Sequence, residues 1–148
     1  MTDRLRIIGW GNVDREDDGA GIVVARRLLE LGIPALCCSG DAISLIDAWK
    51  GAASVVIVDA IVTGAPAGSL QVWDVSEAQL PRTPAATTHG LGLGETIALA
   101  RSLGQLPPTL RVYGIEAAKF GFGSDLSPAV ANTVDKLVSQ IAAEFKQR

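Results

Sequence analysis

The segment Ser54–Asp59 is the feature of this 148-residue chain that most constrains its fold. It reads Ser-Val-Val-Ile-Val-Asp, an almost continuous run of β-branched residues. Such a run is typical of a central strand in a parallel sheet, where helices cover both faces and successive side chains are all buried. The segment therefore predicts an α/β protein with Ser54–Asp59 as a central strand.

Strand-like apolar runs alternate with helical patterns along the rest of the chain, an order typical of a sheet with helices on both faces. We expect a single domain over residues 1–148: a three-layer α/β/α sandwich with a mixed, mostly parallel sheet of about five strands. The turn Gly64–Gly68 predicts a hairpin, so the strand after it should run antiparallel. The long loop Ser76–Thr88 is expected to contribute a functional surface. The expected strands are Leu5–Gly9, Ala35–Ser39, Ser54–Asp59, Ser69–Asp74 and Thr109–Tyr113; the expected helices are Asp18–Leu31, Ser44–Lys50, Leu91–Leu103 and one that Ser127 caps and Pro128 begins.

Composition and charge exclude several classes of partner. The formal net charge is −3 and the Lys and Arg residues form no basic stripe, so nucleic acid is not expected to bind. The charged segment Met1–Arg6 leads directly into a strand, and no apolar run approaches the length of a membrane span. We expect a cytoplasmic protein without a membrane partner. The adjacent Cys37 and Cys38 would point to opposite faces of a strand, so they are expected to be reduced and buried.

The junction between the first strand and the first helix is rich in glycine and in carboxylates. Gly9-Trp-Gly-Asn12 is followed by Glu16-Asp-Asp-Gly-Ala-Gly21. Glycines permit a tight turn and a close approach of two backbones. A phosphate-binding loop would not place three carboxylates beside its bare N–H groups, because they would repel the phosphate. The junction therefore predicts a site for a metal ion or a basic group.

Three features fall where an open α/β sheet binds ligands, at the carboxyl ends of its strands. They are the cluster that contains Asp17 and Asp18, Asp59 at the end of the central strand, and His89, the only histidine. Each has a simpler explanation: a carboxylate that caps the first helix, an acceptor for the next turn, and a surface imidazole. Together they supply two carboxylates and an imidazole, a ligand set that suits a divalent ion such as Ni²⁺ or Zn²⁺. They can converge if the first and third strands are neighbours.

Other chemistries fit these residues less well. Gly9-x-Gly11 lacks the third glycine of a dinucleotide fingerprint. His89 and Asp59 could form a triad with a serine, but no serine lies in a Gly-x-Ser-x-Gly turn. A Cys–His pair would need Cys37 or Cys38 to be exposed near His89. If the chain is an enzyme, its nucleophile is expected to be water.

The pattern Gly9-x-Gly11-Asn12-x₄-Asp17-Asp18-Gly19-x-Gly21 resembles the N-terminal signature of the hydrogenase maturation endopeptidases. The resemblance continues over nearly the whole chain and in the family's order. The further matching segments are Val58-Asp59-Ala60, Pro66-Ala67-Gly68, Thr88-His89-Gly90-Leu91, Gly114-Ile115-Glu116 and Leu126-Ser127-Pro128-Ala129-Val130.

The resemblance implies an enzyme that removes the C-terminal extension of the large-subunit precursor of [NiFe] hydrogenases. It implies that Asp18, Asp59 and His89 are the metal-contacting and catalytic residues, with Glu16 a less favoured substitute for Asp18. The nickel would be carried by the precursor, so the enzyme would recognise its substrate by the bound metal and would need no organic cofactor.

One segment departs from the family pattern. Where many members have Asp-Gly-Gly-Thr, this chain has Cys38-Ser-Gly-Asp41, so Asp41 could supply only a displaced carboxylate. Two other functions stay open at this point. One is a metal-binding chaperone that contacts the precursor without cutting it, and the other is an α/β domain in which Gly9–Asn12 cradles a small molecule.

Overall fold

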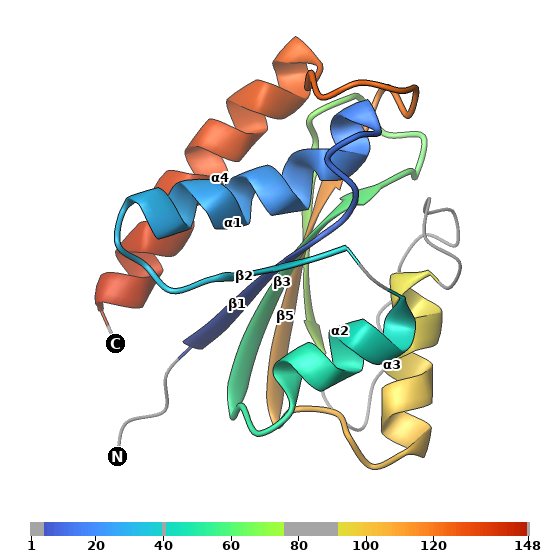
Figure 1. Ribbon diagram of the computed structural model, residues 1–148, viewed down its shortest axis with the longest axis vertical. Coiled ribbons are helices and arrows are strands. Elements are labelled where there is room, and N and C mark those ends of the chain that lie inside the picture. Colours follow the sequence, from blue (N-terminus) through green and yellow to red (C-terminus); the bar gives the residue numbers. More distant parts are fainter. Residues whose placement is uncertain (1–4, 40, 76–91, 148) are drawn as a thin grey trace.

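Five strands form one mixed sheet in the computed structural model, which describes residues 5–39, 41–75 and 92–147 (Figure 1). The strand order is β2-β1-β3-β5-β4; β4 is antiparallel to its neighbour and the other pairs are parallel. The predicted three-layer α/β/α fold with a mostly parallel sheet is confirmed. The strands are β1 (Leu5–Trp10), β2 (Leu36–Cys38), β3 (Ser54–Ile61), β4 (Leu70–Val75) and β5 (Thr109–Glu116).

The central position predicted for the β-branched run is confirmed. Every residue of β3 is buried, and the strand pairs with β1 on one side and with β5 on the other. Strand β3 extends two residues past Asp59, because Ala60 and Ile61 continue the ladder opposite Ile115 and Glu116. Asp59 is therefore inside the strand rather than at its end.

The predicted hairpin is wrong, although the antiparallel direction is confirmed. Strand β4 pairs with β5, with Val72 opposite Tyr113, and does not pair with β3. Both edges of β3 are occupied by β1 and β5, so the returning chain adds to the free side of β5.

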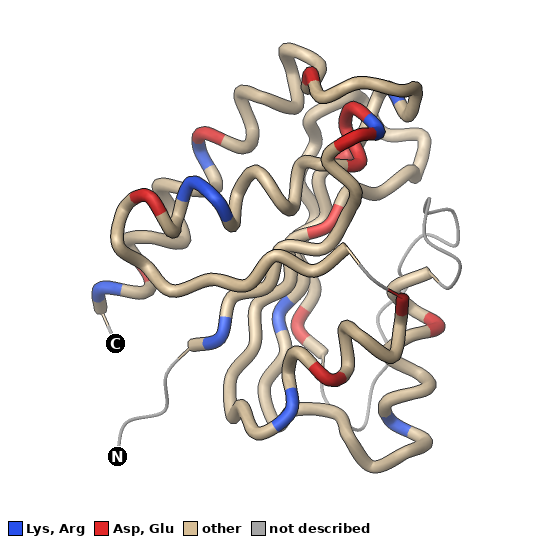
Figure 2. The backbone as a smooth tube through the Cα atoms, in the orientation of Figure 1, with Lys and Arg blue, Asp and Glu red and all other residues tan. Residues whose placement is uncertain are grey.

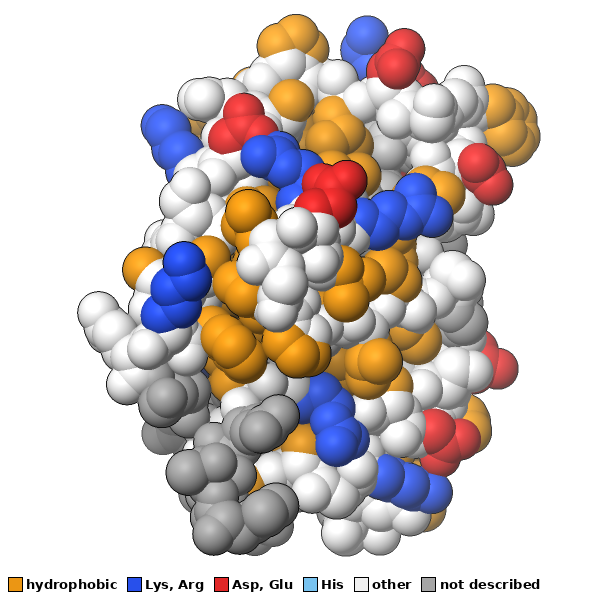
Figure 3. Space-filling view, turned by 60° about the vertical axis from the view of Figure 1, so that its left-hand side comes forward, with side chains coloured by type: hydrophobic (Ala, Val, Ile, Leu, Met, Phe, Trp, Pro, Cys, Tyr) orange, Lys and Arg blue, Asp and Glu red, His pale blue; other side chains and the backbone are white. Residues whose placement is uncertain are grey.

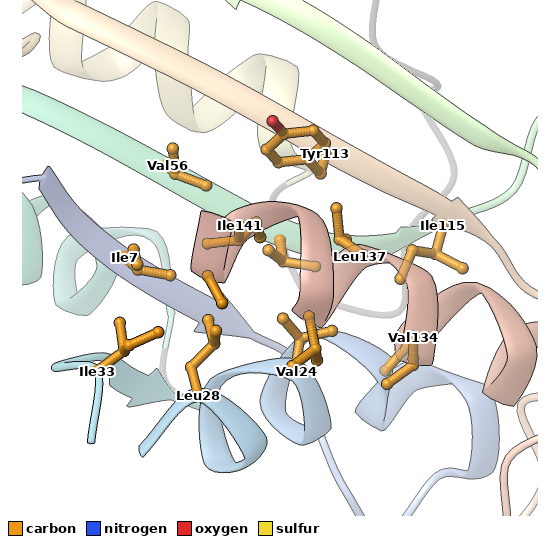
Figure 4. Packing of buried hydrophobic residues seen from close by; sticks show 14 of the residues in the cluster. Ile7, Val24, Leu28, Ile33, Val56, Tyr113, Ile115, Val134, Leu137 and Ile141 are labelled. Atoms are coloured by element: carbon orange, nitrogen blue, oxygen red, sulfur yellow. The ribbon is translucent and has the colours of Figure 1, made fainter. Parts of the chain in front are cut away.

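Two pairs of helices cover the two faces of the sheet. Helices α1 (Ala20–Glu30) and α4 (Pro128–Lys146) pack together on one face, and α2 (Ala42–Trp49) and α3 (Leu93–Ser102) on the other (Figure 1). Figure 4 shows the first of these layers, where side chains of both helices meet those of the sheet. Each large aliphatic group buried there contributes roughly 1.5–3 kcal/mol of transfer free energy. The labelled members of this core are Ile7, Val24, Leu28, Ile33, Val56, Tyr113, Ile115, Val134, Leu137 and Ile141.

The first helix begins differently from the prediction. A short 3-10 helix, η1 (Glu16–Gly19), precedes α1, and Gly19 occupies the N-cap position without a side-chain cap. Neither Asp17 nor Asp18 therefore caps α1. Ser127 does occupy the N-cap position of α4, but its side chain makes no cap hydrogen bond.

The two cysteines are free, but the expectation that both are buried is wrong. Cys37 is exposed and Cys38 is half-buried. Their strand β2 has only three residues and lies at the edge of the sheet, so one of its sides has no neighbouring strand.

The surface seen in Figure 3 carries basic and acidic side chains interspersed with hydrophobic groups. No helix in the described ranges is long and apolar enough to cross a membrane.

Candidate functional site

Acidic positions gather around η1 at one end of the sheet (Figure 2). Glycines allow this short helix to lie against the strands. A Cβ on Gly21 would lie 2.2 Å from the carbonyl oxygen of Val58, and one on Gly9 would lie 2.1 Å from that of Gly21. Because no other residue fits at these distances, the glycines bring the start of α1 directly beside Val58 and the neighbouring Asp59.

N–H groups of the turn Gly9–Asn12 donate hydrogen bonds to other parts of the protein. The Gly11 N–H donates to the Cys38 carbonyl at 3.2 Å, and the Asn12 N–H donates to the Asp18 carbonyl at 3.2 Å. The Asn12 side-chain oxygen accepts from the Asp14 N–H at 2.9 Å. Since these N–H groups already have protein acceptors, the turn is not arranged to cradle a small-molecule ligand.

Asp18 and Asp59 are buried carboxylates with unsatisfied oxygen atoms. Asp18 is 1% exposed and Asp59 is fully buried. Asp59 Oδ1 accepts a hydrogen bond from the Ala60 N–H at 2.9 Å. In the described part of the chain, Asp18 Oδ1 and Asp59 Oδ2 have no hydrogen-bond partner. The pKa of Asp59 is raised well above its ordinary value, first by burial and then by the negative charge of Asp18.

Two other buried carboxylates show how this chain satisfies such groups when their role is structural. Asp17 accepts from the Ala118, Lys119 and Ser127 N–H groups and from the Ser127 hydroxyl, at 2.7–2.9 Å. Glu116 accepts from the N–H and the hydroxyl of Thr63, in each case below 3 Å.

Burial alone would raise the pKa of Asp17, but the hydrogen bonds from Ser127, Ala118 and Lys119 outweigh it, and its pKa is lowered. The sequence pattern did not reveal this role, because the donors lie about 100 residues away along the chain. The hydrogen bond from Ser127 to Asp17 also explains why the Ser127 side chain does not cap α4.

Unlike Asp17 and Glu116, Asp18 and Asp59 each keep one buried carboxylate oxygen without a hydrogen-bond partner among the described residues. Buried polar atoms in folded proteins almost always have partners, and the ionised form of Asp59 is disfavoured both by burial and by the negative charge of Asp18. A divalent cation would relieve both effects, since it accepts carboxylate oxygen as a ligand and neutralises the charge.

The third predicted ligand, His89, lies outside the described residues. Within the ranges that are described, no group of three or more His, Cys, Asp or Glu side chains is placed to hold a metal ion. The structure thus brings together two of the three predicted site residues and leaves the third untested.

Two further acidic residues have other partners. Glu16 Oε1 accepts a hydrogen bond from the Gly121 N–H at 2.8 Å, so this side chain is engaged with a neighbouring loop. Asp41 is the N-cap of α2 and accepts from the Ser44 N–H at 2.9 Å. This hydrogen bond is the main cause of the lowered pKa of Asp41. In the segment that departs from the family pattern, Asp41 therefore has a structural role.

Comparisons with known proteins agree with this fold. Residues 40–144 match the model of a family described as hydrogenase maturation protease. The hydrogenase expression/formation protein HupD of Thiocapsa roseopersicina is 26% identical over 150 residues, which cover 95% of this chain and 66% of that protein. The chain thus spans slightly less than two thirds of the length of this relative.

Two solved structures are also similar. The [NiFe] hydrogenase maturation protease HybD from Thermococcus kodakarensis is 29% identical with a TM-score of 0.77, covering 95% of this chain and 97% of that one. The [NiFe] hydrogenase maturation protease HycI from the same organism is 26% identical with a TM-score of 0.72, covering 97% and 93%. The chain belongs to the hydrogenase maturation protease family, whose members are hydrolases that cut a peptide bond.

Proposed function

We propose that this protein is an endopeptidase that removes the C-terminal extension of a [NiFe]-hydrogenase large-subunit precursor after nickel has been inserted. The observation that carries the proposal is the pair of buried carboxylates, Asp18 and Asp59, whose Oδ atoms lack partners in the described structure. Membership of the maturation protease family supplies the class of substrate.

In this proposal Asp18, Asp59 and His89 contact the nickel that the precursor carries. The carboxylates supply two hard oxygen ligands and the imidazole supplies a nitrogen ligand. Metal and scissile peptide arrive together as parts of one substrate, so a precursor without nickel is not a substrate. Cleavage of the precursor is proposed to take place in the cytoplasm and to need no organic cofactor.

The chemistry that such an arrangement supports is metal-assisted hydrolysis. The ion polarises the scissile carbonyl or lowers the pKa of a bound water, and water is the nucleophile. In this proposal the positive charge of the ion offsets the burial and the repulsion from Asp18 that disfavour the ionised form of Asp59. Asp59 is held in place by the ladder of β3 and by its hydrogen bond from Ala60.

The test is intact-mass analysis of a nickel-loaded precursor before and after incubation with this protein. The proposal expects the loss of one C-terminal peptide, and no loss when the precursor lacks nickel or when His89 is replaced by Ala. A stable complex without a change of mass would instead identify a non-proteolytic metal-binding chaperone. Cleavage that persists in both Asp59→Ala and His89→Ala would contradict the assigned residues.

A further inference from the structure

Phe122 is the most exposed large hydrophobic residue among those described, with 96% of its surface open to solvent. It lies between β5 and α4, with a glycine on each side. Single exposed apolar residues are common on protein surfaces and need no special explanation. What distinguishes Phe122 is the backbone that carries it, residues 119–123, which we call the Phe122 loop.

The two residues that flank Phe122 are fixed by hydrogen bonds to the segment just before Asp18. The Gly121 N–H donates to Glu16 Oε1 at 2.8 Å, and the Glu16 N–H donates to the Gly123 carbonyl at 2.8 Å. The Gly123 N–H in turn donates to the Asp14 carbonyl at 2.9 Å. The loop is therefore held immediately before and after the exposed ring.

The earlier part of the loop is tied to the same segment. Arg15 Nη2 donates to the Phe120 carbonyl at 2.7 Å. Asp17 exchanges hydrogen bonds with Lys119: its N–H donates to the Lys119 carbonyl, and its carboxylate accepts from the Lys119 N–H. Surface loops that move usually have few such bonds, so this one is a fixed platform for its apolar side chain.

Glu16 adopts a backbone conformation that is uncommon for a residue with a side chain. Its φ is +52°, in the left-handed region. Such conformations persist where the surroundings enforce them, and they gather at functional sites. Here the conformation directs Glu16 to Gly121, while the next two residues, Asp17 and Asp18, are buried.

The Phe122 loop lies at the same end of the sheet as Asp18 and Asp59, the end at which the parallel strands have their carboxyl termini. It follows β5, in which Gly114 is the register partner of Asp59, and it is bonded to the residues that precede Asp18. The two carboxylates are almost completely buried, so they offer nearly no area to a protein partner. A specific complex with a protein buries about 800 Å² of each partner, and this area must come from the rim around the carboxylates.

We propose that Phe122 is an apolar anchor that docks the polypeptide of the precursor beside the carboxylate site. The inference rests on the proposed function, because the occupant to which it commits is the protein substrate. Aromatic side chains are enriched at the centres of protein–protein interfaces, and a loop whose backbone is already fixed loses little further conformational entropy on binding. Glu16 is a positioning residue: it holds the Phe122 loop in place through the hydrogen bond that it accepts from the Gly121 N–H.

The experiment compares steady-state cleavage of a nickel-loaded precursor by the wild type, Phe122→Ala, Phe122→Leu and the control Leu103→Ala. Leu103 is 52% exposed but lies after α3, near the start of β5 and so at the other end of the sheet. We expect Phe122→Ala to raise KM about 10-fold or more with kcat within about 2-fold. Phe122→Leu should recover most of the loss, and Leu103→Ala should match the wild type.

Glu16 is tested by a matched pair of substitutions. Glu16→Ala removes the acceptor for Gly121, so KM should rise as in Phe122→Ala, whereas Glu16→Gln keeps a side-chain oxygen there and should restore KM. The double variant Glu16→Ala/Phe122→Ala should have a KM close to that of Phe122→Ala, because both substitutions act on one contact. A fall of kcat with unchanged KM in Glu16→Ala would assign this carboxylate to the chemistry and would overturn its positioning role.

Equilibrium binding separates this inference from the proposed function. The Kd of the precursor is measured in an Asp59→Asn background, with and without Phe122→Ala, and should change by the same factor as KM. If the wild type cuts but neither KM nor Kd depends on Phe122, the anchor is wrong and the proposed function stands. If the wild type binds without cutting and binding depends on Phe122, the proposed function fails and the anchor stands. Absence of both cutting and binding would overturn both.

Discussion

Asp17 and Asp18 are neighbours in the chain, yet their carboxylates have opposite environments. Asp17 accepts hydrogen bonds from the N–H groups of Ala118, Lys119 and Ser127 and from the Ser127 hydroxyl. Asp18 Oδ1 has no partner among the described residues. Asp17 connects η1 to the segment that leads into α4, whereas the unpartnered oxygen of Asp18 is the one that the proposed function assigns to the nickel of the precursor.

The first prediction concerns the loss of activity at the proposed site. Asp18→Asn, Asp59→Asn and His89→Ala each remove a charge or a ligand from the nickel contact. We expect processing of the precursor to fall by at least about 100-fold in each, since a metal held by fewer ligands loses affinity and orientation. Intact-mass time courses measure the rate, and circular dichroism checks that the fold is kept. Wild-type rates in any of the three would remove that residue from the site.

The second prediction is that Asp59→Asn stabilises the protein at neutral pH. Because the pKa of Asp59 is raised in the folded state, the unfolded chain ionises first as the pH rises above the ordinary value of 3.8. The folded state then binds more protons than the unfolded state, so stability falls with rising pH until the folded-state pKa has been passed. Asn has the same shape and no charge, so the free energy of unfolding of the variant does not fall in this way. A stabilising substitution of this kind typically raises the free energy of unfolding by about 0.5–2 kcal/mol.

The measurement is the melting temperature of Asp59→Asn and of the wild type from pH 4 to pH 8, without metal. The advantage of the variant should be small at pH 4 and should grow with pH. Asp74→Asn is a control, because Asp74 is an exposed carboxylate on β4 with an ion pair to Arg111. An advantage that stays constant across this range would show that the ionisation of Asp59 is not its cause.

The third prediction concerns Asp17 as a structural residue. Asp17→Ala leaves the buried donors of Ala118, Lys119 and Ser127 without an acceptor, which should lower the free energy of unfolding by about 2–4 kcal/mol. Ser127→Ala removes only the hydroxyl hydrogen bond and should lower it by about 1 kcal/mol. Urea unfolding at pH 7 measures both, and equal effects would contradict the assignment of the backbone donors to Asp17.

The pH dependence of this contribution has the opposite sign to that of Asp59. The pKa of Asp17 is lowered in the folded state, so its stabilisation is present above the ordinary value of 3.8 and is lost as the pH falls through the folded-state value. The difference in the free energy of unfolding between the wild type and Asp17→Asn should therefore become smaller in acid.

The central strand could be predicted from the sequence because its pattern is local. The run at 54–59 is β-branched throughout, and such a run is stable only where both faces are covered. The pairing of β4 could not be predicted, because strand order depends on which edges are already occupied. The prediction that Cys37 is buried was wrong for the same reason, since nothing in the sequence around Cys37 indicates that β2 is an edge strand.

The candidate site shows the same limit. Asp18 and Asp59 could be selected because the sequence places them after the first strand and at the end of the central strand, where an α/β sheet binds ligands, although β3 continues two residues past Asp59. The roles of Asp17 and Glu16 depend on residues 118–127, about 100 positions away, and no local pattern pairs these segments. The hydrogen bonds that fix the backbone on either side of Phe122 likewise come from Asp14 and Glu16, more than 100 positions away.

The last prediction tests the close approach that brings η1 to the end of β3. In Gly21→Ala the new Cβ would lie 2.2 Å from the Val58 carbonyl and 2.8 Å from the Trp10 carbonyl, so the start of α1 must move away from the sheet. Backbone oxygen atoms cannot give way as a flexible side chain can, and overpacking of this kind destabilises by about 1–3 kcal/mol or more. Because Asp18 lies three residues before Gly21 and Asp59 follows Val58, the same movement separates the two carboxylates. We expect Gly21→Ala to process the precursor much more slowly than the wild type even at a temperature where the variant is still folded.

Ala25→Gly, one turn later in α1, is the control: it weakens the helix by about 1 kcal/mol without adding an atom, and it should cut at nearly the wild-type rate. Equal loss of processing in both variants would show that helix stability, and not the approach of α1 to β3, decides the activity.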